Sequence, residues 1–311
     1  MRMPDIVGDT WLNSEPLGPE DLRGKVVLAD FWTYSCINCL RTMPYLKRWW
    51  DKYREFDFLM IGIHAPEFAF EKEPENVGRA MRELWVEWPV VLDNRHVNWH
   101  NFANHYWPAK YMADRSGEIV YEHFGEGEYA QTEKMIQQLL LQDPRIQSLP
   151  PIDEEGAARS CVKPTPETYC GFLRGHLANN GGYARGAAAT YERPVGLKDD
   201  SIALDGKFLA APEYVESAEP GATLLLSFTA TEVNLVLRAA ADVAVISVSL
   251  DGEAVDAPIR GDDMDEGGTV TVGEPRMYNL LRSGSPLRAT LAVTAAEGSF
   301  QAYAFTFSGC K

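Results

Sequence analysis

In the first 145 residues, short apolar runs alternate with segments in which apolar residues recur at helical spacing. Residues 25–32 form an apolar run typical of a buried strand, and in residues 36–53 the apolar positions repeat every three or four residues, which predicts a helix. Further strands are expected at 58–63, 90–92, 110–113 and 118–123, and further helices at 76–88, 97–105 and 131–141. This alternation predicts a layered α/β domain with helices on both faces of one sheet.

The pattern changes after residue 145. Residues 146–166 are rich in proline and acidic residues without periodicity, which indicates a linker. Residues 167–311 contain short β-rich segments, with an extended loop expected at 175–190. The predicted strands lie at 223–229, 233–238, 243–250, 268–272, 276–281, 288–294 and 299–307. Turn signals such as the one at 283–286 separate several of them, so the second half is predicted to be an all-β sandwich.

Composition and charge limit the possible partners. A chain of 311 residues that is 45% hydrophobic is long enough for two domains with cores of their own. Its 29 basic and 45 acidic residues give a formal net charge of −16, which argues against nucleic acid and anionic membrane surfaces as partners. The apolar runs are too short for a membrane span, and the start lacks the apolar stretch of a signal peptide. We therefore expect a cytoplasmic location for the sequence as it stands, and a periplasmic or cell-surface one if an export signal or anchor was removed.

Two of the five cysteines form the motif Cys36-Ile37-Asn38-Cys39, directly after a predicted strand and at the start of a predicted helix. A helix N-terminus stabilises a thiolate, and in such motifs the pKa of a cysteine thiol falls from about 8.5 to roughly 3.5–7.5. The placement predicts that Cys36 attacks a disulfide and that Cys39 resolves the mixed disulfide. The alternatives are a structural disulfide or half of a zinc site, but no second pair of ligands stands at zinc spacing. We expect no cofactor other than the redox-active dithiol, and no metal.

Two other polar clusters were considered as metal sites. His96, His100 and His105 do not share one helical face, and the acidic residues at 262–268 have the composition of a solvated turn. We expect neither to bind a metal ion.

Four segments, at 30–39, 66–72, 106–111 and 125–129, resemble the thioredoxin-like domain of DipZ proteins. These are bacterial cytochrome c biogenesis and thiol–disulfide proteins, related to redoxins of the TlpA and AhpC/TSA types. The resemblance covers residues 1–145 closely and the second half more loosely. It implies a thioredoxin-like domain followed by a jelly-roll-like β-sandwich that is similar to carbohydrate-binding modules. The membrane-spanning part of DipZ is missing from this sequence, so electron transfer across a membrane is not implied.

The resemblance also implies roles for single residues. Asp30 lies inside the strand before the cysteines, where burial would raise its pKa and let it accept the proton of Cys39. Pro44 falls where the active-site helix of thioredoxin is kinked, and Pro108 matches the cis-proline loop that faces the cysteine pair. The residues expected to contact a substrate are Trp32, Tyr34, Trp107 and Glu67.

The leading functional hypothesis is therefore a thiol–disulfide oxidoreductase whose partners are protein thiols or disulfides and a redox partner protein. A peroxiredoxin-like peroxidase that uses Cys36 is an alternative, because Thr33 and Cys36 match part of that signature. Ala29 stands where the signature has proline, which favours disulfide exchange. A third hypothesis is a binding or scaffold protein whose β-domain captures a glycan or a protein.

The remaining cysteines lie in the second half of the chain. Cys170 and Cys310 stand near the first and last strand signals of the β-domain, and terminal strands often pair. This predicts a Cys170–Cys310 disulfide and leaves Cys161 as a free thiol.

Overall fold

The computed structural model describes residues 1–153 and 161–309, and the chain divides into two compact units, Met1–Ala157 and Ala158–Lys311. The first unit is built on one six-stranded sheet with the strand order β1-β4-β3-β2-β5-β6. The strands are β1 (Trp11–Leu12), β2 (Val26–Trp32), β3 (Phe58–His64), β4 (Val90–Leu92), β5 (Ala109–Ala113) and β6 (Ile119–Phe124). β2 runs parallel to β3 and antiparallel to β5, so it lies in the middle of the sheet.

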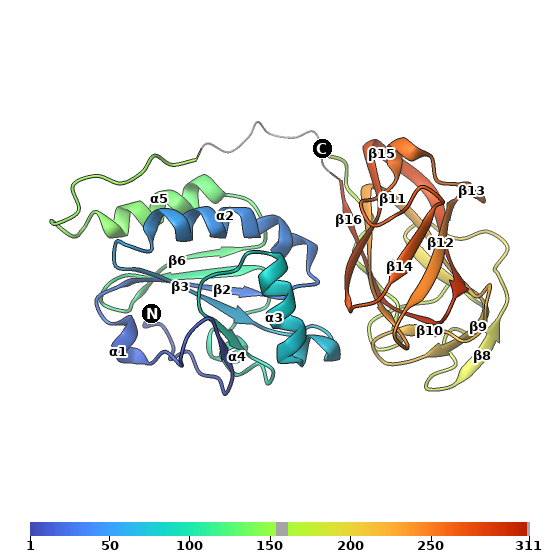
Figure 1. The fold of residues 1–311 in the computed structure, drawn as a ribbon, viewed down its shortest axis with the longest axis horizontal. Coiled ribbons are helices and arrows are strands. Elements are labelled where there is room, and N and C mark those ends of the chain that lie inside the picture. Colours follow the sequence, from blue (N-terminus) through green and yellow to red (C-terminus); the bar gives the residue numbers. More distant parts are fainter. Residues whose placement is uncertain (154–160, 310–311) are drawn as a thin grey trace. The chain divides into compact units, whose positions relative to one another are not determined.

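Helices cover both faces of this sheet, as the alternating pattern predicts (Figure 1). They are α1 (Pro19–Leu22), α2 (Ile37–Tyr53), the 3-10 helix η1 (Ala69–Lys72), α3 (Pro74–Glu83), α4 (Val97–Asn101) and α5 (Tyr129–Leu140). α2 and α5 lie together on one face, and α1 and α4 lie on the other (Figure 1). The rings of Tyr45 and Tyr129 stack at 3.5 Å and join α2 to α5. None of the helices among the described residues has both the length and the apolar character needed to cross a membrane.

The alternation of side chains along β2 decides which residues lie beneath α2. Val27, Ala29 and Phe31 belong to the core that also contains side chains of α1 and α4. Since successive residues of a strand point to opposite faces, Asp30 points to the face that α2 and α5 cover. A carboxylate of the central strand is thus placed beneath the helix that begins at the cysteine motif.

The first part of the predicted linker is attached to the first unit. Lys52 Nζ, on α2, donates to the carbonyl of Pro151 at 2.9 Å and lies 2.8 Å from Glu133 Oε1 of α5. The backbone N–H of Asp153 donates to the other oxygen of Glu133 at 3.1 Å. Residues up to Asp153 therefore extend the packed unit beyond the predicted boundary at residue 145.

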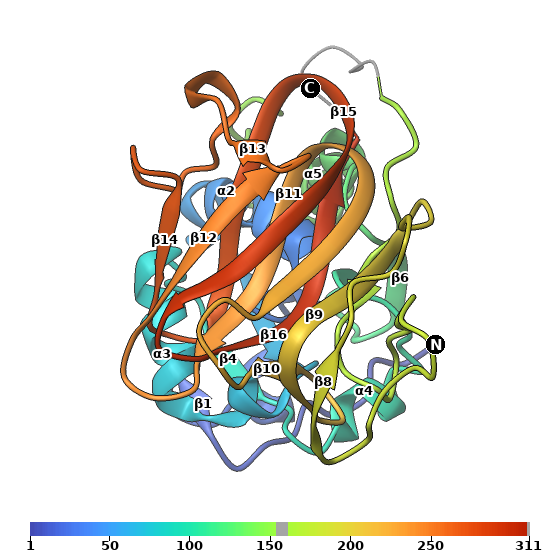
Figure 2. The ribbon, with the colours of Figure 1, turned by 90° about the vertical axis from the view of Figure 1, so that its right-hand side faces the viewer.

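The second unit is all-β, as predicted. Ten strands form one hydrogen-bonded sheet. They are β7 (Thr168–Tyr169), β8 (Ala188–Tyr191), β9 (Ser201–Ala210), β10 (Val215–Ser217), β11 (Thr223–Ala239), β12 (Ala244–Leu250), β13 (Glu253–Ala254), β14 (Thr269–Val272), β15 (Arg276–Glu297) and β16 (Phe300–Ser308), with the 3-10 helix η2 (Ala257–Ile259) between β13 and β14. β12, β15 and β11 lie side by side in Figure 2. The strands do not divide into two separate sheets, because β11 pairs with β9 and β16 as well as β15.

Two pairs of predicted strands are single long strands. The segments predicted at 223–229 and 233–238 are both part of β11, and those at 276–281 and 288–294 are both part of β15. The turn signal at 283–286 still marks a real irregularity, because these four residues lie opposite the single residue Thr231 between the pairs Ala230–Leu287 and Glu232–Arg282. β8 falls within and just beyond the predicted loop, and β9 and β10 were not predicted.

Candidate active site

Cys36 and Cys39 lie at the N-terminus of α2 with very different exposure. Cys36 is the N-cap residue and is partly exposed, and its Sγ accepts the backbone N–H of Cys39 at 3.3 Å. Cys39 is 1% exposed, and both thiols are free. Burial raises the pKa of the Cys39 thiol, and its hydrogen bond to Cys36 raises it further. Cys36 is thus the accessible thiol of the pair, and the buried Cys39 would need a base to ionise.

A candidate base is Asp30, which is buried in β2 and whose charge acts on Cys39. Its carboxylate oxygen Oδ1 lies 3.9 Å from Nζ of Lys110, which is also buried and stands directly opposite Asp30 in the β2–β5 ladder. Burial raises the pKa of Asp30 to about 7, while the charge of Lys110 opposes the rise. The charges of Asp30 and Cys39 also act on each other. A carboxyl group that titrates near neutral pH beside Cys39 can accept its proton.

Lys110 was missed by sequence reasoning. Burial lowers its pKa, while the charges of Asp30 and Cys39 act in the opposite direction. The sequence signal was a lysine inside the otherwise apolar strand that follows Trp107-Pro108. A buried lysine is rare unless it is paired, so this signal could have suggested a partner on a neighbouring strand.

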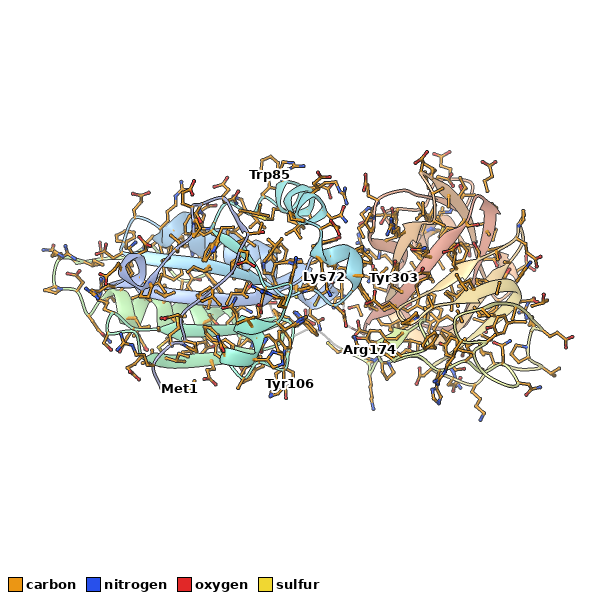
Figure 3. The ribbon with its side chains drawn as sticks, turned by 90° about the horizontal axis from the view of Figure 1, so that it is seen from below. Met1, Lys72, Trp85, Tyr106, Arg174 and Tyr303 are labelled. Atoms are coloured by element: carbon orange, nitrogen blue, oxygen red, sulfur yellow. The ribbon has the colours of Figure 1, made fainter. Side chains whose placement is uncertain are left out.

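The loop before β5 lies at the same sheet edge as the cysteine motif. The Trp107–Pro108 peptide bond is cis. Ala109 pairs with Phe31, so Pro108 lies beside the end of β2, from which the chain continues to Cys36. Next to it, Tyr106 is 54% exposed and projects from the surface of the first unit (Figure 3).

Of the four residues expected to contact a substrate, two are buried and two are partly exposed to solvent. Trp32 and Tyr34 are buried, so the expectation that they contact a substrate is wrong in this structure. Tyr34 stacks on His64 at 5.7 Å, and Trp32 meets the same imidazole edge-on, because both aromatic residues pack inward against β3. Trp107 and Glu67 are partly exposed, and Nε1 of Trp107 donates to the carbonyl of Ala65 at 3.0 Å.

A second buried carboxylate, Glu71 of η1, also escaped sequence reasoning although its segment was singled out. Its Oε1 accepts the hydroxyl of Ser35, the residue before Cys36, at 2.6 Å, and the backbone N–H of Ser35 at 3.3 Å. Its Oε2 accepts the backbone N–H groups of Glu67 and Phe68 at 2.6 and 3.0 Å. The contacts between Ser35 and Glu71 join residues 36 positions apart. They depend on tertiary structure, so local sequence pattern could not reveal them.

The predicted Cys170–Cys310 disulfide is wrong, because Cys170 is a free and fully buried thiol. Cys170 lies just after β7 in the core of the second unit, where burial raises its thiol pKa. Cys161, predicted to be free, is disulfide-bonded. Cys310 lies outside the described residues.

No metal centre can be assigned from side-chain clusters. In residues 1–153 and 161–309, no three His, Cys, Asp or Glu side chains gather in a way that could hold a metal ion. In the acidic turn at 262–268, Asp263 accepts from Arg276 at 2.6 Å and Asp265 accepts from the hydroxyl of Thr269 at 2.6 Å. These carboxylates are therefore bound by donors of the protein itself.

Known proteins resemble the chain along nearly its whole length. Residues 165–308 match the family described as the thioredoxin like C-terminal domain. Over 98% of its length, the chain is 34% identical to Protein DipZ from Mycobacterium bovis. The chain is DipZ-like, and its first unit is thioredoxin-like. It spans 42% of the length of that curated relative, so it corresponds to one part of it.

Two further similarities each cover less than half of the DipZ-like chain. The chain is 27% identical to the thiol-disulfide oxidoreductase YkuV from Bacillus subtilis, over 44% of this chain and 93% of that relative. A solved thioredoxin-like protein in the oxidised form is 29% identical, with a TM-score of 0.42, and covers 45% of this chain and 95% of its own.

The carbohydrate-binding expectation for the second unit was tested against its aromatic side chains and the matched family. Phe228, Tyr278, Tyr303 and Phe305 are buried, and Tyr214 is partly buried. Buried rings contribute to the core of the unit and present no face to a ligand. The description of the matched family makes no mention of a glycan, so the carbohydrate-binding expectation gains no support.

Proposed function

We propose that this chain is a thiol–disulfide oxidoreductase that exchanges disulfides of protein substrates through Cys36 and Cys39. The observation that carries the proposal is the asymmetry of the pair: an accessible thiol caps a helix, and a buried thiol one turn further along lies near a carboxyl group whose pKa is about 7. The curated relatives named as thiol-disulfide oxidoreductases support the same reaction class.

In the first step, the Cys36 thiolate attacks one sulfur of a substrate disulfide. The substrate S–S bond breaks, a Cys36–substrate disulfide forms, and the departing substrate sulfur leaves as a thiolate that takes a proton from water. The N–H of Cys39 and the helix N-terminus stabilise the attacking sulfur before the reaction.

In the second step, Cys39 resolves the mixed disulfide. Asp30 accepts the proton of the Cys39 thiol, and the resulting thiolate attacks Sγ of Cys36, which expels the second substrate sulfur. The products are a Cys36–Cys39 disulfide and a substrate dithiol, so two electrons pass from the pair to the substrate. A partner protein with a dithiol reverses these steps and restores the reduced pair.

The test is reduction of insulin disulfides by the full chain with dithiothreitol as the electron source. We expect the wild type to accelerate the reaction, Cys36→Ser to abolish the acceleration, and Cys39→Ser to accumulate mixed disulfides with the substrate. Cys170→Ser is the matched control, because it removes a buried thiol of the other unit. Peroxide consumption is measured in parallel. A wild type that consumes peroxide through Cys36 but does not reduce insulin would contradict the proposal and favour the peroxidase alternative.

A further inference from the structure

Glu71 is buried at the edge of the cysteine motif, and the mechanism above does not use it. It is fully enclosed, and its two carboxylate oxygens accept four hydrogen bonds from two separate segments. On one side the donors belong to Ser35, and on the other they are the backbone N–H groups of Glu67 and Phe68. A buried carboxylate that receives this many donors is held in one place, and it holds its donors in return.

The two segments that Glu71 joins have different roles. Ser35 is the residue before the N-cap Cys36, so its position determines where the chain enters α2. Phe68 is the N-cap of η1, and Glu71 caps that short helix by accepting the N–H of Phe68. The same side chain therefore caps the start of η1 and anchors the chain just before the start of α2.

The groups around Glu71 are few and uncharged on the side of the cysteine. Thr33 also hydrogen-bonds to its carboxyl group, and Nε2 of His64 lies 3.3 Å from the hydroxyl of Thr33. Glu67 is the charged residue that acts on Glu71. Burial raises the pKa of Glu71 to about 7, while the hydrogen bonds from Ser35 and Thr33 oppose the rise.

We propose that Glu71 is a positioning residue for the nucleophile, which fixes Ser35 and thereby keeps Sγ of Cys36 aligned with the N-terminus of α2. This inference deepens the proposed function, on which it rests. The alignment matters because the sulfur accepts the N–H of Cys39 at 3.3 Å, and such an N-cap contact is lost when the preceding residue moves. The negative charge of Glu71 is offset locally by its hydrogen-bond donors, so we expect position to outweigh charge in its effect on Cys36.

Replacement of Glu71 can change the alkylation rate of Cys36 through lost alignment or through lost charge. These two effects have opposite signs, which makes the inference testable. Glu71→Gln keeps the shape of the side chain but replaces one acceptor oxygen by a donor, so it cannot satisfy all four donors. Loss of alignment makes the Cys36 thiolate less stable, and alkylation of Cys36 becomes slower at pH values above the pKa of Glu71, where the wild-type carboxyl is ionised. Loss of a nearby negative charge would make the thiolate more stable and alkylation faster.

The experiment measures alkylation of Cys36 by iodoacetamide in the reduced full chain, quantified by peptide mass spectrometry at pH 8, where the Glu71 carboxyl is ionised, and at pH 10. For Glu71→Gln we expect a rate about fivefold lower at pH 8 and within about twofold of the wild type at pH 10, at which an ordinary cysteine thiol is ionised as well. Ser35→Ala removes the 2.6 Å hydroxyl bond without changing any charge, and we expect a decrease of at least about twofold at pH 8.

The matched control is Glu133→Gln, because Glu133 is also buried and accepts from Lys52, Tyr53 and the N–H of Asp153. Lys52 lies 16 residues from Cys36 along the helix, about 24 Å away. This variant should lose stability but alkylate Cys36 at the wild-type rate, which separates a positioning role from a general loss of structure.

An unchanged or faster rate at pH 8 in Glu71→Gln would overturn the inference. If Glu71→Gln does not fold, Ser35→Ala decides in its place, and an unchanged rate there has the same meaning. Alkylation requires no disulfide substrate, so its rate tests the positioning role of Glu71 independently of the insulin assay. A wild type that fails to reduce insulin refutes the proposed function alone.

Discussion

Replacement of Lys110 by methionine tests whether the buried lysine sets the proton affinity of Asp30. Coulomb's law at the observed 3.9 Å, with an effective dielectric constant of 20, gives about 4 kcal/mol, which corresponds to about 3 units of pKa. Burial lowers the pKa of Lys110, so its ammonium group does not carry a full charge at all pH values, and this value is an upper bound. We expect Lys110→Met to raise the pKa of Asp30 from about 7 by about 1–3 units.

The sign of the effect follows from the role of Asp30 as a proton acceptor. A carboxyl group accepts a proton only above its pKa, so a raised pKa moves the pH at which Cys39 becomes an efficient nucleophile toward the alkaline side. At pH 7.5 the second step should therefore slow by about tenfold, and the rate should recover at higher pH.

The assay follows the second step alone. Cys36 is first converted to a mixed disulfide with a coloured aromatic thiol, and release of that thiol by Cys39 is recorded by stopped-flow absorbance at several pH values. Lys134→Met, which removes an exposed lysine of α5, is the control and should leave the profile unchanged. A Lys110→Met profile that rises at the same pH as the wild type would refute the assignment of Asp30 as the base that Lys110 tunes.

Three further variants test the stability of the fold by chemical denaturation. The double variant Asp30→Asn/Lys110→Met should be more stable than the wild type by about 1–4 kcal/mol, because it removes two buried charges together. The pKa of Asp30 is raised in the fold, so its ionisation costs stability as pH rises from about 4 to about 7, and the gain should grow over that range. Gly62→Ala should cost about 1–3 kcal/mol, because a Cβ there would lie 2.9 Å from Nε1 of Trp32. Phe305→Ala should lower the free energy of unfolding of the second unit by about 3–5 kcal/mol and leave the insulin assay unchanged, because Phe305 is in the core of that unit. The argument about buried charges fails if the double variant is less stable than the wild type. The argument about Gly62 fails if Gly62→Ala has the stability of the wild type, and the argument about Phe305 fails if the second unit of Phe305→Ala unfolds as in the wild type.

The sequence predicted the elements around the cysteine motif closely because local pattern determines them. β2 and α2 begin within one residue of the expected positions, since an apolar run and a helical repeat need no knowledge of neighbours. Asp30 was found for the same reason, as a charged residue inside an apolar run. Its partner Lys110 was not found from the sequence, because the pairing of these two residues depends on the register between two strands that are 80 residues apart.

The second unit was harder to predict because its strands are defined by their pairing. The turn signal at 283–286 would end an isolated strand, but β15 continues past it because both of its halves pair with β11. In β9, Asp205 and Gly206 interrupt the apolar pattern, yet Asp205 pairs with Thr223 of β11 and the strand continues to Ala210. Such pairing overrides local composition, so sequence pattern alone separates strands that the fold joins.

The unequal exposure of the two cysteines has a consequence for the lifetime of a mixed disulfide in the proposed mechanism. Of the pair, Cys36 is the accessible thiol, so a substrate would be held by a single covalent bond while Cys39 stays buried about one helical turn away. Release by Cys39 would be an intramolecular reaction, and its rate would depend on the geometry of α2 and on pH rather than on the concentration of free thiols around the protein. The fold would thus set an upper limit to the lifetime of each complex, even in thiol-poor surroundings.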